Sequence, residues 1–572
     1  MKEKILKTLK SKLMFAGVLN LLIMSFCVLV TAFSYANSKD FYNSIFVCQN
    51  HYYYSSNINY ILAVVVGTLQ YALTDINAYV LVEVGFSFAA FTSITYVFAD
   101  KYSYRKAFVF SMVINILFAL DHYSRIDGGK TSALLLTGGF LLVLNAVRNK
   151  RYTLPFWAGV AEIACGSFYN FESFFVALAF AVAFFLGDMI AKKKVRLGFQ
   201  KFFWYFRPFL LSFLLVTLVT AGLHQFSYSI NHSSEESANY YEYSSLKDSI
   251  DSLPFPDYKE HEEEFAEVGI SNDSEYELLK NGYYDDSRML NLSAMQLVSN
   301  IQEAESGKTV LYAAGTLLED TWSHIMCMDS LLFATAVFLM ISGVFILYHK
   351  NRFSFFPLFY AVAAVAAGIT VRYLFDNSPF RSYGICLMML VLLIYSFNFE
   401  ISRRFSLIEK LRKSHGYMIL SCLVLIALFG SYTTMYMLST PDREGDAPWS
   451  LITEINRKPD CYYVMDTASK DKFDRYTENY LHPMWGFRPG YLENLDSFGY
   501  HHNYELLRKR NLSYNIYEAL LTNRKIYVVD EYITFKKEKY FNINYGKKYE
   551  NIYYQLVKEL DNYKIYEVVV ER

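Results

Sequence analysis

Residues 13–34 read LMFAGVLNLLIMSFCVLVTAFS, a run that holds no charged side chain. An α-helix rises about 1.5 Å per residue, so about 20 apolar residues cross the roughly 30 Å hydrocarbon core of a bilayer. Apolar runs of similar length recur along the chain, and the last one covers residues 418–438. The sequence therefore predicts a polytopic α-helical membrane protein.

The composition agrees with a membrane protein. Hydrophobic residues make up 53% of the 572 residues and charged residues 19%. The 50 tyrosines suit the headgroup layer of a membrane and equally suit stacking against sugar rings, so their number does not choose between these roles. The formal net charge of −1 argues against nucleic acid as a partner, because nucleic-acid-binding proteins concentrate basic residues.

The distribution of lysine and arginine predicts the orientation, because short cytoplasmic loops are enriched in both. Lysines at positions 2, 4, 7, 10 and 12 precede the first span and place the amino terminus in the cytoplasm. About eleven spans put every later basic cluster on the same side. After residues 13–34 the expected spans are 77–99, 106–122, 131–147, 153–169, 171–190, 205–228, 328–348, 353–375, 384–399 and 418–438.

The apolar run at residues 61–73 is short for a span, and counting it would move every later basic loop to the outside. We therefore expect a helix that lies in the outer interface or re-enters the membrane there. The transmembrane domain at residues 1–438 then carries two outer loops, at 35–76 and 231–325, and the tail at 439–572 is extracytoplasmic.

The tail has the pattern of a small α/β domain, and its length suits a separate hydrophobic core. Alternating hydrophobicity predicts strands at residues 461–465, 525–529 and 563–568, and helical periodicity predicts helices at 504–509 and 552–560.

Charged residues near the outer ends of the spans are the first candidates for chemistry, since charge is costly at membrane depth. One follows the first span, a second group lies in the turn DHYSRIDGGK at residues 121–130, and others lie near later outer turns. The candidates are Asp40, Asp121, His122, Arg125, Lys130, Glu172, Arg372 and Arg381.

Most of these candidates also have a structural explanation. Asp40 fits a solvated boundary residue, and residues 121–130 fit a simple charged turn. Arg372 fits a side chain whose apolar stem lies near the end of a span while its charged group reaches the membrane–water interface. Glu172 lies in an apolar stretch where an acid needs a partner or water, which favours a functional role.

Neither the cysteines nor the acidic residues define a cofactor site. Cys48 and Cys461 both lie outside the membrane in this topology and could pair, although their spacing does not require it. The adjacent Asp285 and Asp286 offer a metal site but are equally typical of a solvated surface. We assign no metal ligand and no certain cofactor, and a divalent cation stays open.

Several short motifs carry a resemblance to a known class. They are SKD at residues 38–40, YSRIDGGKTSA at 123–133, GSFYNFESF at 166–174, VGISND at 268–273, YDD at 284–286, GYLENL at 490–495 and NIYEAL at 515–520. With the predicted topology, the chain resembles the GT-C class of glycosyltransferases that use polyprenyl-phosphate sugars. It resembles still more a family of bacterial polytopic proteins with that architecture.

The resemblance implies an inverting transfer of sugar from a polyprenyl-phosphate donor to an envelope glycan or glycolipid acceptor. The reaction would take place at the outer face of the bacterial plasma membrane, with membrane lipid around the donor. By resemblance Asp40 is the general base, and Arg125, Lys130 and Arg381 are candidates for holding the departing phosphate.

One feature departs from the class, whose members commonly carry two acids close together in the first outer loop. Here the residue before Asp40 is Lys39. Either Asp75 or Glu172 supplies the second acid, or catalytic activity has been lost.

Two other functions remain open from the sequence. A transporter or flippase of lipid-linked saccharides would carry inverted repeats and helices interrupted near the bilayer midplane, and neither is clear in this chain. A noncatalytic envelope scaffold would use its outer segments to bind partners.

Overall fold

We describe the protein from a computed structural model. The description covers residues 2–30, 34–36, 38–49, 53, 58–73, 75–191, 199–250, 254–281, 292–306, 355–375, 381–396, 448–480, 491–497, 510–513, 515–530 and 534–571, with short helical pieces within 314–343.

The contacts within the chain define two compact units. The first unit comprises Met1–Phe33, Val82–Phe226 and Thr309–Thr440, and the second comprises Ser34–Leu81, Ser227–Lys308 and Pro441–Arg572. The second unit thus collects the segments that the sequence analysis places outside the membrane. Each unit is described by itself.

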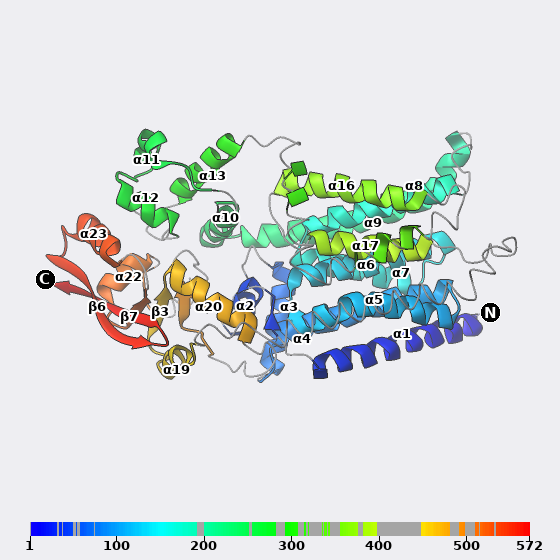
Figure 1. Ribbon diagram of the computed structural model, residues 1–572, viewed down its shortest axis with the longest axis horizontal. Helices are drawn as coiled ribbons and strands as arrows, with labels where there is room; N and C mark the ends of the chain where they lie inside the picture. The colour runs from blue at the N-terminus through cyan, green and yellow to red at the C-terminus, as the bar shows by residue number, and fades with distance from the viewer. Residues whose placement is uncertain are drawn as a thin grey trace. The chain divides into compact units, whose positions relative to one another are not determined.

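Long helices that run side by side build the first unit (Figure 1). They are α1 (Lys2–Val30), α4 (Ala78–Lys101), α5 (Tyr104–Ser124), α6 (Gly128–Asn149), α7 (Leu154–Tyr169), α8 (Glu172–Ala191), α9 (Phe199–Asn231), α16 (Phe356–Phe375) and α17 (Arg381–Ser396).

Among the described residues, six helices are long and apolar enough to cross a membrane. They lie in α1, α4, α5, α6, α8 and α9. This finding supports a polytopic helical membrane protein. The expected span at 418–438 and most of the one at 328–348 lie outside the described residues.

Helix α6 forms the centre of the first unit, because nearly all of its side chains are buried. Its backbone closely approaches that of α7. A Cβ atom on Gly139 would lie 2.7 Å from the carbonyl oxygen of Gly159, and a Cβ on Gly159 would lie 2.7 Å from the carbonyl oxygen of Gly139. Glycine at both positions therefore permits the helices to pack backbone to backbone.

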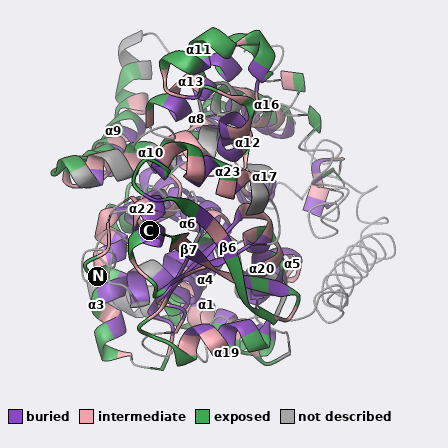
Figure 2. Ribbon diagram, turned by 90° about the vertical axis from the view of Figure 1, so that its left-hand side faces the viewer, coloured by how far each residue is buried: buried purple, intermediate pink, exposed green. Residues whose placement is uncertain are grey.

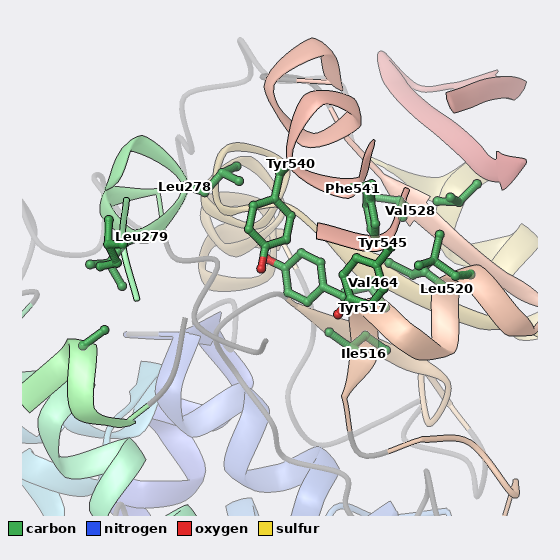
Figure 3. Packing of buried hydrophobic residues seen from close by; sticks show 14 of the residues in the cluster. Leu278, Leu279, Val464, Ile516, Tyr517, Leu520, Val528, Tyr540, Phe541 and Tyr545 are labelled. Carbon is green, nitrogen blue, oxygen red and sulfur yellow. The ribbon is translucent and has the colours of Figure 1, made fainter. Parts of the chain in front are cut away.

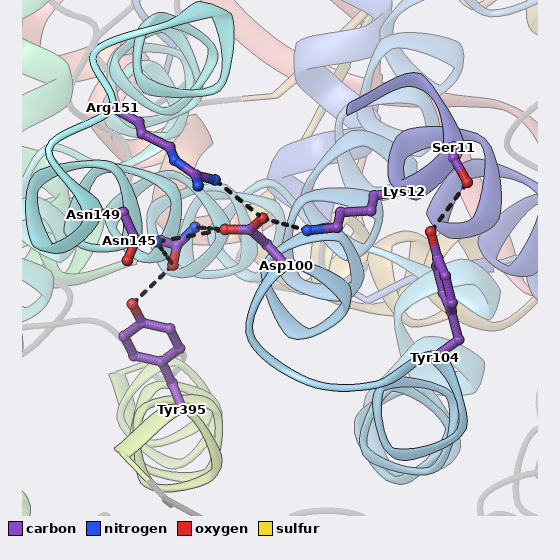
Figure 4. A network of polar contacts seen from close by, with 8 residues as sticks. All are labelled: Ser11, Lys12, Asp100, Tyr104, Asn145, Asn149, Arg151 and Tyr395. Carbon is purple, nitrogen blue, oxygen red and sulfur yellow. Dashed lines mark hydrogen bonds and ion pairs between the residues drawn. The ribbon is translucent and has the colours of Figure 1, made fainter. Parts of the chain in front are cut away.

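A polar network ties the helices together at one end of this unit (Figure 4). Asp100 of α4 accepts hydrogen bonds from Lys12 (2.7 Å) and Asn145 (3.0 Å), and Arg151 lies 3.9 Å from it. Tyr395 of α17 donates to Asn145 (3.0 Å). Three of the basic segments that we expect on the cytoplasmic side thus meet at one end of the helices.

A five-stranded sheet forms part of the second unit. Its strands are β3 (Tyr462–Met465), β4 (Leu495–Ser497), β5 (Ile526–Val529), β6 (Asn551–Leu560) and β7 (Tyr563–Glu571), in the order β4-β3-β5-β7-β6. Strands β4, β3 and β5 are parallel, whereas β7 is antiparallel to β5 and to β6.

In the described part of the tail, four helices accompany the sheet: α19 (Trp449–Arg457), α20 (Thr467–Tyr480), α22 (Ile516–Thr522) and α23 (Thr534–Tyr545). Helix α19 is amphipathic, with Leu451, Ile452 and Ile455 buried and exposed residues on its other side (Figure 2). The sequence therefore folds this helix by burying one apolar stripe.

The predicted strands at 461–465, 525–529 and 563–568 are confirmed as β3, β5 and β7, but the helix predicted at 552–560 is wrong. These residues form β6, which makes a hairpin with β7. Asp561 and Asn562 connect the two strands with φ angles of 50° and 63°. Two consecutive left-handed residues match the twist of a hairpin. The helix predicted at 504–509 lies outside the described residues.

Further described elements of the second unit come from the two outer segments. They are α2 (Ser38–Ser44), the π-helix η1 (Ile45–Gln49), α3 (Tyr60–Ala72), α10 (Glu235–Ile250), η3 (Tyr258–Glu260), α11 (Glu262–Glu267), α12 (Asp273–Lys280) and α13 (Leu292–Ser306). Helix α3 coincides with the short apolar run that we predict to be a helix.

The described part of the tail shares a buried hydrophobic cluster with the second outer segment. Residues between 250 and 301 belong to the same buried cluster as the strands and helices of the tail. Leu278 and Leu279 of α12 belong to this cluster together with Tyr517, Tyr540 and Val464 (Figure 3). The second outer segment is therefore part of the folded core.

Candidate functional site

The turn between α5 and α6 forms a buried polar cluster in the first unit. Lys130 Nζ donates to Asp121 Oδ2 at 2.7 Å, and the two residues are only 2% and 7% exposed. Asp127 caps α6, since its Oδ1 accepts the backbone N–H of Lys130 at 2.8 Å. The charged turn expected from the sequence is thus an internal feature rather than a solvated loop.

His122 extends this cluster to α17. Its Nδ1 lies 2.9 Å from the hydroxyl of Tyr383, and Lys130 Nζ lies 5.8 Å from the centre of the Tyr383 ring. The other ring nitrogen, Nε2, is buried and has no hydrogen-bond partner in the described part of the chain. Sequence reasoning missed Tyr383, and its only signal is its position two residues after the candidate Arg381.

Arg125 differs from Lys130 in its partners. Arg125 is half-buried, and its buried Nε has no hydrogen-bond partner among the described residues. Lys130, in contrast, is paired with Asp121. A phosphate would have to compete with a carboxylate for Lys130, so Arg125 is the better donor for an anionic ligand.

The turn between α7 and α8 lies next to α6. Ser132 Oγ of α6 donates to the carbonyl oxygen of Asn170 at 3.4 Å, and Asn170 Oδ1 accepts the N–H of Ser173 at 3.1 Å. Glu172 begins α8 in this turn and is half-buried. The structure therefore brings the turn of Glu172 to the end of α6 that carries Lys130.

The last two candidates of this unit are arginines on α16 and α17. Arg381 is the first residue of α17, two residues before Tyr383, and Arg372 belongs to the last part of α16. Their side chains lie outside the described part of the structure.

Asp40 belongs to α2, in the second unit. Its side chain is 5% exposed, and Oδ1 accepts a hydrogen bond from the hydroxyl of Tyr79 at 2.6 Å. Ser44 Oγ donates to the Asp40 carbonyl oxygen at 2.9 Å, and Asn77 Nδ2 donates to the hydroxyl of Tyr35 at 2.9 Å. Asp40 is thus a buried acid in a polar network, not a solvated boundary residue. Asp75, the other acid considered in this loop, is exposed.

Helix α20 of the tail packs against α2, which sequence reasoning did not foresee. The hydroxyl of Tyr42 donates to Asp474 at 2.8 Å, Lys470 pairs with the same carboxylate, and the rings of Phe41 and Phe473 lie 6.4 Å apart. The tail thereby helps to fix the helix that carries Asp40.

Cysteines and one cluster of acidic residues with a histidine are the candidates for metal or disulfide sites within the described residues. Cys48 and Cys461 are both free thiols, and burial raises the pKa of Cys48 to about 12, which disfavours the thiolate form that binds metals. Ligand atoms of Glu260, His261 and Glu305 lie within 4.8 Å of one another. Both glutamates are exposed, and His261 is already hydrogen-bonded to Glu305, so we assign no metal to this group. The aspartate pair at 285–286 lies outside the described residues.

Comparison of the chain with protein-family models, with curated proteins and with solved structures finds no match.

Proposed function

We propose that this protein is a GT-C-type membrane glycosyltransferase that moves a sugar from a polyprenyl-phosphate donor to an extracytoplasmic envelope acceptor. The observation that supports it most is the cluster at the α5–α6 turn. There the Nε of Arg125 has no hydrogen-bond partner among the described residues, beside the buried pair of Asp121 and Lys130. Such a donor near a helix end suits the phosphate of a lipid whose chain lies in the bilayer.

The proposed reaction is an inverting displacement at the anomeric carbon. In the GT-C class that the chain resembles, an acid accepts the proton of the attacking acceptor hydroxyl, which then bonds to the sugar as the lipid phosphate departs, and Asp40 of the second unit is the candidate for this role. Arg125 stabilises the negative charge on the departing phosphate by a charge-assisted hydrogen bond. Tyr79, which donates to Asp40, orients the carboxylate. Glu172 is the candidate for a second acid.

The proposed topology has about eleven spans in a bacterial plasma membrane, with a cytoplasmic amino terminus and an extracytoplasmic tail. Two observations support it. The Asp100 network gathers basic segments from three parts of the chain. The turns that contain Lys130 and Glu172 lie together at helix ends other than those joined by the Asp100 network.

A transporter or flippase of lipid-linked saccharides is the second candidate. One observation favours it: Glu162 places a carboxyl group in the middle of α7. Ionisable residues within a helix bundle commonly mark ion or substrate pathways in transporters.

Donor binding by the full-length protein in lipid nanodiscs tests the proposal. A panel of polyprenyl-phosphate sugars would be offered to the wild type and to Arg125→Gln. Loss of one charged hydrogen bond, about 1.5–3 kcal/mol, predicts a fall in affinity of at least about tenfold. Arg151→Gln is the matched control, because Arg151 belongs to the Asp100 network and is largely exposed.

Two results would count against the proposal. Equal donor affinity in the wild type and in Arg125→Gln would remove Arg125 from the phosphate site. Movement of the lipid-linked saccharide across a vesicle membrane without sugar transfer would favour the transporter.

A further inference from the structure

The middle of α7 holds an acid that the proposed transfer site does not use. Glu162 is eight residues after Leu154, the first residue of the helix, which corresponds to about 12 Å along its axis. Helix α7 packs against α6, one of the helices long enough to span a membrane, through Gly139 and Gly159. Glu162 therefore lies far from both ends of a helix that packs against α6.

The two oxygens of the Glu162 carboxyl group have different surroundings. Ser93 of α4 donates its hydroxyl to Oε1. Oε2 is buried and has no hydrogen-bond partner in the described part of the structure. A Cβ atom on Gly138 of α6 would lie 2.9 Å from Oε2, so the glycine leaves the space that this oxygen occupies.

Three other acids in the same unit are paired with cations. Asp100 pairs with Lys12 at 2.7 Å, and Asp121 pairs with Lys130 at 2.7 Å. Asp188 lies 3.8 Å from Arg148 and accepts a hydrogen bond from Tyr205.

Glu162, in contrast, has no lysine or arginine partner among the residues that the structure describes. On the elements packed against it, Ser93 and Gly138 are uncharged. Cys165, one turn further along α7, is the titratable neighbour that interacts with it. A negative charge on Glu162 would therefore lie in an apolar region without a countercharge, which is costly.

We propose that Glu162 is an intramembrane proton-binding site, with Ser93 holding Oε1 and Gly138 providing room for the protonated Oε2. The ligand is the proton itself, and the neutral acid is the form that this environment accommodates. The proton site does not depend on sugar transfer, so this proposal can fail or hold independently of the proposed function.

Dicyclohexylcarbodiimide tests this proposal, because it is apolar and adds to protonated carboxyl groups. The acid gives its proton to a carbodiimide nitrogen while its oxygen bonds to the central carbon. Migration of the acyl group to nitrogen then leaves a stable N-acylurea, with no atom lost. Full-length protein in nanodiscs would be treated at neutral and at alkaline pH, and the adduct would be located by peptide mass spectrometry.

We expect an adduct on Glu162 at neutral pH that is lost as the pH rises and is absent in Glu162→Gln. The paired acids Asp100, Asp121 and Asp188 should stay unmodified. Asp188→Asn is the matched control and should leave labelling of Glu162 unchanged. Gly138→Ala should reduce labelling, since the added methyl group crowds Oε2.

An unmodified Glu162 in protein whose monodispersity shows that it is folded would overturn the proposal. Equal labelling of Glu162 and the paired acids would also overturn it, because Glu162 would then not differ in protonation from acids that are paired with cations. Glu162→Gln also has to fold like the wild type, since glutamine is close in shape to the neutral acid. A large loss of thermal stability in Glu162→Gln would show that a charged carboxylate is needed instead.

Discussion

Lys130 of α6 and Asp121 of α5 form a buried ion pair across the turn that joins the two helices. Lys130 Nζ lies 2.7 Å from Asp121 Oδ2. Their side chains are 3% and 10% exposed. Water cannot replace either partner there, so each charge depends on the other. The pair therefore holds the ends of α5 and α6 together at the proposed donor site.

Replacing one partner of this ion pair should destabilise the protein more than replacing both partners. We expect Lys130→Met or Asp121→Asn to lower the free energy of unfolding by about 3–5 kcal/mol, because each leaves one uncompensated buried charge. The double variant should lose less than either single variant. Denaturant unfolding of the full-length protein in detergent measures these differences, and additive losses would show that the two side chains act independently.

The sequence predicted part of this site because its residues are close in the chain. Asp121, His122, Arg125 and Lys130 share one turn between two apolar runs, so their proximity follows from the connection. Tyr383 joins them from a helix that begins more than 250 residues later. Its place depends on how α17 packs against α5 and α6, and local periodicity does not contain that information.

The differences between the sequence predictions and the structure of the second unit have identifiable physical causes. Residues 552–560 contain spaced apolar side chains that also fit a helix, whereas Asp561–Asn562 is a turn signal that favours a hairpin. The predicted topology makes residues 231–325 an outer loop. Its Phe265, Leu278 and Leu279 are nevertheless fully buried. A few apolar residues in a polar segment were thus enough to join the core of the tail.

Close packing of α6 against α7 should make Gly139 intolerant of a side chain. A Cβ atom there would lie 2.7 Å from a backbone oxygen of Gly159, so we expect Gly139→Ala to cost about 1–3 kcal/mol. Gly85→Ala in α4 is the matched control, because nothing lies within 4 Å of the added carbon. Alanine also favours a helix over glycine by about 1 kcal/mol, so Gly85→Ala should be neutral or stabilising. Thermal unfolding compares the two variants, and equal shifts would contradict the packing argument.

Catalysis should depend on Asp40 if the proposed transfer is correct. Asp40→Asn removes the base and should slow sugar transfer by about 10²- to 10⁴-fold while donor affinity stays unchanged. Tyr79→Phe removes the hydrogen bond that orients this carboxylate, and we expect a smaller loss of rate together with a shifted pH profile. Asp75→Asn is the control, because Asp75 is an exposed acid of the same loop. A rate unaffected by Asp40→Asn would exclude Asp40 as the base.

Glu454 should give the second unit a defined acid sensitivity. It lies 2.6 Å from Lys458 and 3.0 Å from Lys558, and the hydrogen bond from Lys458 is the main reason that the pKa of Glu454 is lowered. A glutamate in an unfolded chain has a pKa of about 4.3. Its stabilising contribution is therefore complete above that pH and is lost as the pH falls through the lower value of the folded protein.

Hydrogen–deuterium exchange of peptides from α19 and β6 in the full-length protein measures this acid sensitivity. Protection in the wild type should fall below about pH 4 relative to protection in Glu454→Gln at the same pH, since the glutamine variant has already lost the ion pairs. Glu559→Gln, an exposed position of β6, should behave like the wild type. If Glu454→Gln and the wild type lost protection in parallel, the two lysine contacts would contribute nothing to stability, as holds for many exposed ion pairs.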